Sequence, residues 1–188
     1  MPDRRAFLQI SALLSLAAAE QSSAFMPLGA REISASKLVY DRRFGDSVSF
    51  ARVAARGGSA IFAIERDVTT LWRLELERHW RSSQAPVGGL TQECSLFALE
   101  QLAWESQWQL VYRTDHALHD DGTVEHRCFA TEAVARRIDA ARGQWPAAIA
   151  QLLTRYPLTA QASAGCARRH PISRQTELLV SWLMLPRL

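Results

Sequence analysis

Residues 38–67 restrict the fold of this chain more than any other stretch. A short apolar run at 38–40 is followed by a turn at Gly45, and a second apolar run at 59–64 follows a glycine pair. The segment between the runs has the length and the terminal glycine of a helix. Because two strands joined by one helix pair in parallel through a right-handed crossover, these residues predict a strand–helix–strand unit. Any ligand of such a unit should bind beyond the carboxyl ends of its strands.

The alternation of strands and helices continues beyond this unit. The expected elements are a helix from Asp67 to about residue 82, a short buried strand at 86–90, a helix at 91–105 and a strand at 108–112. Such alternation is typical of an open sheet with helices on its faces. The sequence therefore predicts an α/β fold with a mostly parallel open sheet, in flavodoxin-like or Rossmann-like layering.

An antiparallel hairpin and C-terminal helices complete the predicted fold. Asp121 and Gly122 lie between two alternating segments and favour a two-residue turn, which would pair residues 113–119 with 123–129. Helices are expected at 131–142 and 146–156. The apolar run at 178–184 is expected to form a last strand, although its length also fits a short helix.

The first 19 residues have the pattern of a cleaved leader. An apolar run of about 13 residues, shorter than the roughly 20 needed to span a bilayer, ends in three alanines that suit a signal peptidase. The leader resembles the twin-arginine (Tat) export signal, and it matches that signal at Arg4, Arg5, Phe7 and Leu8. It departs from the commonest residues at Asp3 and Gln9. The alternative is an ordinary secretory leader that carries two arginines.

The resemblance implies export to the bacterial periplasm in a folded state, either with a cofactor or together with a partner. The sequence shows no cofactor motif, because it lacks Cys-x-x-Cys-His, a cysteine cluster and a Gly-x-Gly-x-x-Gly turn. We therefore expect an exported accessory or small subunit that associates with a larger periplasmic enzyme of the redox class. The apolar run at 178–185, if exposed, would serve as its contact strand.

Length and charge bound the part that follows the leader. Removal of residues 1–19 leaves about 169 residues, which we divide into a linker or arm at 20–36 and a single α/β domain at 37–188. The whole chain has 22 basic and 19 acidic residues. This balance argues against nucleic acid as a partner, and contact with the membrane is expected only through the leader.

The predicted parallel sheet gathers polar residues at one edge. Glycines before a helix expose backbone N–H groups to an anion, and arginines hold a carboxylate or phosphate through paired hydrogen bonds. The alternative is that the acidic and hydroxyl residues only cap helices while the arginines are solvated. The expected site for an anionic small molecule comprises Asp41, Arg42, Arg43, Asp67, Thr69, Gly88, Gly89, Thr91 and Arg113. Convergent arginines around a closed pocket would favour this second function, a carboxylate- or phosphate-binding protein or a small enzyme, and an exposed aromatic patch would favour the accessory subunit.

The cysteines and histidines give two weaker hypotheses. Cys94 follows the Thr91 cap in a first helical turn, where the helix dipole favours a reactive thiolate, but burial is equally typical of that position. A two-residue hairpin turn would place Asp115, His119, His126 and Cys128 on one face. His119, His126 and Cys128 are ligand types for zinc or copper, yet their spacing matches no standard site and no metal is favoured. With Cys166 the chain has three cysteines, which allow three thiols or one disulfide.

The export signal gives the first testable prediction. Replacing both Arg4 and Arg5 by lysine should leave the precursor in the cytoplasm, because the paired guanidinium groups are the expected recognition element. Fractionation of cells that express the double variant measures this. Export of the unaltered precursor in a strain without the twin-arginine translocase would contradict the resemblance.

Overall fold

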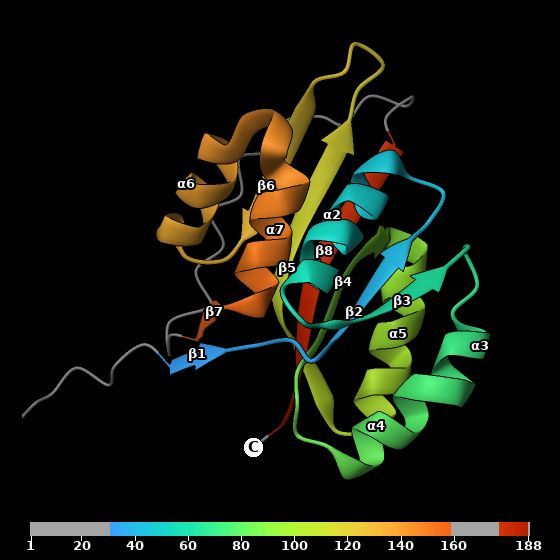
Figure 1. Ribbon diagram of the computed structural model, residues 1–188. Coiled ribbons are helices and arrows are strands. Elements are labelled where there is room, and N and C mark those ends of the chain that lie inside the picture. The colour runs from blue at the N-terminus through green and yellow to red at the C-terminus, as the bar shows by residue number, and fades with distance from the viewer. Residues whose placement is uncertain (1–30, 159–176, 188) are drawn as a thin grey trace, which may run out of the picture. The chain divides into compact units, whose positions relative to one another are not determined.

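The computed structural model describes residues 31–158 and 177–187. The leader positions Arg4, Arg5, Phe7 and Leu8, and also Cys166, lie outside the described residues. Six strands form one mixed sheet in the order β3-β2-β4-β8-β5-β6 (Figure 1). Their bounds are β2 Lys37–Asp41, β3 Ala60–Ile64, β4 Val87–Gln92, β5 Trp108–Leu118, β6 Val124–Phe129 and β8 Glu177–Pro186.

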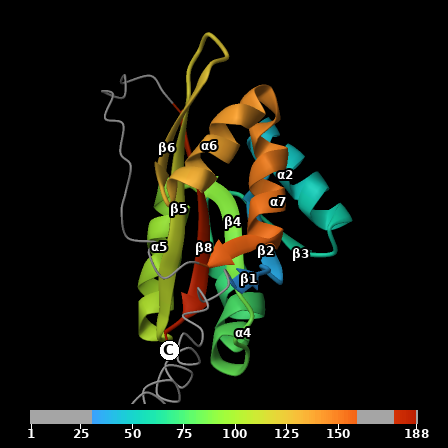
Figure 2. The ribbon, with the colours of Figure 1, turned by 90° about the vertical axis from the view of Figure 1, so that its left-hand side faces the viewer.

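Helices cover both faces of this sheet, as Figure 2 shows. One face carries α2 (Gly45–Arg56), α6 (Glu132–Ala141) and α7 (Trp145–Thr154). The opposite face carries α3 (Thr69–Leu71), a π-helical turn (Trp72–Leu76), α4 (Glu77–Ser82) and α5 (Glu93–Glu105). A 3₁₀ turn, Arg142–Gln144, joins α6 to α7. Two short strands, β1 (Arg31–Ile33) and β7 (Tyr156–Leu158), pair separately and antiparallel.

The mostly parallel sheet expected from the sequence is wrong. Only β2 with β3 and β2 with β4 pair in parallel, whereas β4–β8, β8–β5 and β5–β6 are antiparallel. The helix α5 returns the chain so that β5 runs in the same direction as β4, but β8 lies between these two strands. A strand–helix–strand pattern therefore fixes the direction of a strand without fixing its neighbours.

The apolar run at 178–185 is part of the sheet centre and is not an exposed contact strand. Residues 179–184 of β8 are all buried, and β8 forms ladders with β4 on one side and with β5 on the other. The period-2 alternation of a half-exposed strand is absent because both faces of β8 are covered by helices. The structure thus removes this run as a surface for a partner.

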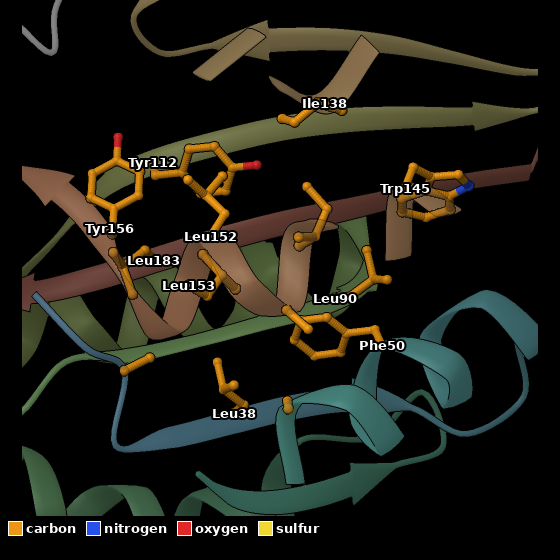
Figure 3. Packing of buried hydrophobic residues seen from close by; sticks show 14 of the residues in the cluster. Leu38, Phe50, Leu90, Tyr112, Ile138, Trp145, Leu152, Leu153, Tyr156 and Leu183 are labelled. Atoms are coloured by element: carbon orange, nitrogen blue, oxygen red, sulfur yellow. The ribbon is translucent and has the colours of Figure 1, made fainter. Parts of the chain in front are cut away.

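Each face of the sheet has its own hydrophobic core. Figure 3 shows the first, in which Phe50 of α2 and the pair Leu152 and Leu153 of α7 pack on sheet residues such as Leu90 and Leu183. The second core contains four aligned residues that the sequence spaces at intervals of four: Val68, Trp72, Leu76 and Trp80. Trp80 stacks on Trp108 at 5.5 Å between ring centroids and accepts the Trp108 indole N–H at its carbonyl oxygen.

Gly88 and Gly89 do not form an anion-binding turn. Both lie in the middle of β4 and are buried, opposite Leu183 and Trp182 of β8. A Cβ atom on Gly89 would lie 2.5 Å from the Val39 carbonyl oxygen and 2.8 Å from the Trp182 ring. Gly89 is needed because the Trp182 indole occupies the space over the strand, and a Cβ atom on Gly88 would lie 2.8 Å from the Trp182 carbonyl oxygen.

This packing predicts a large difference between two glycine-to-alanine changes. Gly89→Ala should lower the free energy of unfolding by about 2–3 kcal/mol, because the added methyl group meets rigid backbone and a buried ring. Gly45→Ala at the start of α2 meets nothing within 4 Å and should change stability by less than about 1 kcal/mol. Urea unfolding of both variants tests the prediction, and equal effects would contradict it.

Candidate functional site

The carboxyl ends of β2 and β4 lie side by side, at the position where open α/β sheets have their binding crevice. From β2 the chain crosses one face of the sheet through α2 to reach β3, and it then returns across the other face to β4 on the opposite side of β2. The connection after β2 leads to α2 on one face and the connection after β4 leads to α5 on the other, which defines a topological switch point between these two strands. Ligands of open α/β sheets bind at such points, so the side chains at this edge are the first candidates.

Asp41 and Arg43 form the centre of this crevice. The Asp41 side chain is fully buried, and Arg43 donates to its two oxygens at 2.9 Å from Nε and at 2.5 Å from Nη2. Arg43 Nη2 also donates to Gln92 Oε1 at 2.5 Å, so one guanidinium joins the ends of β2 and β4. Ser47 of α2 also joins these two strands, because its hydroxyl accepts the Asp41 backbone N–H and donates to the Leu90 carbonyl oxygen. Ser47 therefore holds the strand ends together and does not cap α2.

The electrostatics of Arg43 follow from these contacts. The hydrogen bond that Arg43 donates to Asp41 is the main reason that the pKa of Arg43 is raised, and the nearby Cys94 thiol adds to it. Cys94 lies in the first turn of α5, as the sequence predicts, and it is exposed and close enough to act electrostatically on the guanidinium. The crevice thus contains one buried carboxylate, one arginine and one thiol.

The other expected site residues are not gathered into one anion site. Arg42 pairs with the exposed Glu65, and Arg113 pairs with Glu93 and Asp115 at 2.8 and 2.7 Å. Arg43 and Arg113 therefore share no acceptor. Asp67 accepts the Thr69 backbone N–H at 2.7 Å beside the start of α3, and hydrogen bonding first with the Thr69 side chain and then with its backbone lowers the pKa of Asp67. Thr91 is buried in β4, where it accepts the Trp182 indole N–H, and so does not cap α5.

The hairpin register differs by one residue from the expected one. His116 pairs with His126 and Leu118 with Val124, and the loop has three residues between His119 and Thr123, with Gly122 at a φ of +81°. A glycine in the left-handed region at the third loop position is typical of a three-residue turn. Because side chains alternate along a strand, this shift moves one member of each pair to the other face.

The metal hypothesis fails for this reason. In the observed register Asp115 and His119 lie on one face of the hairpin, whereas His126 and Cys128 lie on the other. Across residues 31–158 and 177–187, no three histidine, cysteine or acidic side chains converge as metal ligands. His126 lies on the face of the hairpin that packs against Trp145 of α7, which we call the inner face. The residue opposite His126 on this face is His116.

A chain of buried polar groups starts at this histidine pair. His116 Nδ1 lies 2.7 Å from His126 Nδ1, and His116 Nε2 lies 2.8 Å from Ser181 Oγ in β8. Ser181 Oγ in turn lies 3.0 Å from the Tyr112 hydroxyl. The His116 ring stacks on Trp145 of α7 at 4.4 Å between centroids. Three elements of the sheet and one helix therefore position four hydrogen-bonding side chains in a row, and we name this row, Tyr112, Ser181, His116 and His126, the histidine chain.

Burial keeps the histidine chain neutral at pH 7. Desolvation, followed by the neighbouring His126, lowers the pKa of His116 well below its ordinary value. Desolvation also lowers the pKa of His126, although Asp139 of α6 opposes the shift. The Tyr112 pKa is raised, again chiefly by burial. A neutral pair of imidazoles shares one N–H between the two facing nitrogens.

The histidine chain ends at an open groove of about 690 Å³ between the hairpin, α2 and α6. His126 and Trp145 lie in its wall with Asp46, Asp139 and Arg142. Burial raises the pKa of the Asp46 carboxyl. Within the described chain, neither Asp46 nor Asp139 makes an ion pair. The groove is thus a polar cleft with a partly buried imidazole at its inner end.

Sequence reasoning did not identify this second site. Ser181 is the one polar residue within the apolar run at 178–185, and a lone hydroxyl in a buried strand needs a partner. That signal, together with a three-residue loop at Gly122, would have placed His116 on the inner face. By contrast, the sequence locates Asp41 and Arg43 at the carboxyl end of β2 from local signals alone.

The comparisons with known proteins give no family. The chain matches no protein-family model, and no curated protein or solved structure is significantly similar to it. None of the helices in the described residues is long and apolar enough to span a bilayer.

The neutral histidines predict a stability that falls on acidification. Their folded-state pKa values lie below the ordinary value of about 6.5, so the unfolded chain takes up protons first as the pH drops below about 6.5. His116, whose pKa is lowered the more strongly, should then remove up to about 1.4 kcal/mol of stability per pH unit, and His126 should remove less. Urea unfolding between pH 7 and pH 5.5 should show a shallower dependence in His116→Gln than in the wild type. An unchanged dependence would contradict the burial argument.

Proposed function

We propose that this protein is an exported accessory subunit that binds a larger folded periplasmic protein through the outer face of α5. The observation that carries the proposal is the exposure of two large aromatic side chains on that helix. Phe97 is 62% exposed and Trp104 is 64% exposed. They are seven residues apart and therefore lie on the same side of the helix, two turns apart.

The surface around these rings is suited to a protein contact. A groove of about 540 Å³ runs beside them, with Leu110, Trp108 and Met184 among its lining residues. The Arg187 guanidinium lies 3.8 Å from the centroid of the Trp104 ring. This contact holds the indole in place and leaves less conformational entropy to be lost on binding. We name Phe97, Trp104 and this groove the α5 surface.

Aromatic residues and arginine are the types enriched at the centres of protein interfaces. Two such rings left in water are also unfavourable for an isolated monomer, because burying each would remove a large apolar area from solvent. The resemblance of the leader to the twin-arginine signal supports a partner that travels with the folded chain. A redox enzyme is the expected partner because such enzymes acquire their cofactors in the cytoplasm.

The α5 surface gives a direct test of the proposal. Affinity capture of the exported protein from its own periplasm should recover one larger partner in stoichiometric amount. Trp104→Ala and Phe97→Ala should each weaken that complex by about 30-fold, the size of a 2 kcal/mol hot spot. Titration of the purified partner by calorimetry measures the change.

Leu74 provides the matched control. It is 72% exposed and apolar, and it lies on the same side of the sheet but outside α5. Leu74→Ala should leave the affinity unchanged. Recovery of the full-length protein without a partner would contradict the accessory role, and equal losses in all three variants would contradict the α5 surface.

A second candidate function is the binding of a small carboxylate or phosphate at the β2–β4 crevice. The observation that favours it is the position of Arg43 at the topological switch point, beside the exposed Cys94. Against it stands the pairing of each arginine with its own carboxylate, so an anion would have to displace Asp41 or Glu65. The accessory role is therefore the better supported of the two.

A further inference from the structure

The groove at the end of the histidine chain differs from the α5 surface in both place and chemistry. It lies on the opposite side of the sheet, between the hairpin, α2 and α6, and its walls combine carboxylates with an imidazole. His126 enters the groove with one ring nitrogen already engaged, because Nδ1 faces His116 at 2.7 Å. Nε2, on the other side of the ring, has no hydrogen-bond partner within residues 31–158 and 177–187.

The state of Nε2 is set by the buried end of the histidine chain. Ser181 Oγ is within hydrogen-bonding distance of three groups: Tyr112 Oη, His116 Nε2 and, at 3.5 Å, the Thr114 carbonyl oxygen. The carbonyl can only accept, so the single Ser181 hydrogen is directed to it when the other two groups both donate to Ser181. His116 then carries its proton on Nε2 and accepts at Nδ1. His126 consequently carries its proton on Nδ1 and presents a bare Nε2 to the groove.

The opposite arrangement exchanges every donor and acceptor along the histidine part of the chain. Ser181 then donates to His116 Nε2, His116 donates from Nδ1 to His126, and His126 presents an N–H to the groove. Two arrangements of the same atoms therefore offer either an acceptor or a donor to a ligand. A ligand that donates selects the first arrangement, and a ligand that accepts selects the second.

The charges in the groove favour a donating cation. Asp139 of α6 acts electrostatically on His126, and Asp46 of α2 is a partly desolvated carboxylate. Arg142, in the turn after α6, supplies the one positive side chain among the lining residues. Glu125 is also among the lining residues, and its carboxylate lies 4.0 Å from His119 Nε2. Even without Glu125, two carboxylates against one guanidinium leave a negative site beside a neutral imidazole.

We propose that this groove binds a small organic cation with N–H donors, of the primary ammonium class. The ammonium group donates to His126 Nε2 and is neutralised by Asp46 and Asp139. The histidine chain holds His126 as an acceptor and thereby positions it for the ligand.

The experiment uses the full mature chain and n-butylammonium chloride as the probe, with sodium butyrate as a probe of equal size and opposite charge. Nitrogen-15 spectra of the histidine rings report which nitrogen carries the proton. Saturating butylammonium should give His126 protonated on Nδ1 and His116 protonated on Nε2, with shifts that saturate, while butyrate should give no saturating change.

Two exposed residues of the groove test the charge argument without touching the buried chain. Asp139→Asn should weaken butylammonium binding by about two- to fivefold, the scale of an exposed ion pair. Arg142→Gln should strengthen it, because the change removes the opposing positive charge.

Four outcomes would overturn the proposal. They are saturating binding of butyrate with His126 protonated on Nε2, weaker butylammonium binding in Arg142→Gln, the same affinity in Asp139→Asn as in wild type, and an absence of any saturating shift with butylammonium. Because α5 lies on the other face, loss of partner binding in Trp104→Ala does not bear on these measurements.

Discussion

The insertion of β8 between β4 and β5 is the interaction on which the rest of this structure depends. β8 supplies one hydrogen-bonding edge to the strand that carries Gly88 and Gly89 and the other edge to the strand that carries Tyr112 and His116. It also sends Trp182 over β4, where only a glycine leaves room. Without β8 the parallel unit and the hairpin would be two half-sheets with exposed backbone edges, which are unstable and prone to aggregate. The last described strand therefore joins two parts of the chain that the sequence connects only through α5.

This dependence explains how much of the fold follows from the sequence. Periodicity, caps and glycines locate the strands and helices, because these signals are local. Which strands lie next to each other in the sheet is not set by local signals. An apolar run such as 178–184 fits any strand that is buried on both faces, and its residues do not indicate which strands flank it. The expected parallel sheet assumed that consecutive strands are neighbours, which holds for β2 and β3 and fails for β4 and β5. The position of Asp41 and Arg43 at the carboxyl end of β2 agrees with the sequence because the end of a strand is marked by local signals, whereas the pairing of β2 with β4 is not local.

The second site could not be predicted for a related reason. One residue in the loop at Gly122 decides which hairpin side chains face α7, and a slip of one residue exchanges the two faces. The same slip that removes His119 from the candidate metal ligands brings His116 against His126. Ser181 reaches them from a strand 65 residues away in sequence. A site built from three distant segments is visible only when both the register and the strand order are known.

The two faces of the sheet differ in the chemistry of their side chains, and packing explains why they remain independent. The α5 side is a core of tryptophans and leucines with apolar rings left outside, which suits a surface that another protein completes. The α6–α7 side contains a row of buried polar groups, which is costly unless every hydrogen has an acceptor. Such a row specifies one strand register and one ring orientation, because any shift would leave Ser181 or His116 without a partner. The histidine chain thus fixes the position of β8 against β5 from one face, while Trp182 fixes β8 against β4. A change on the outside of α5 leaves both constraints in place.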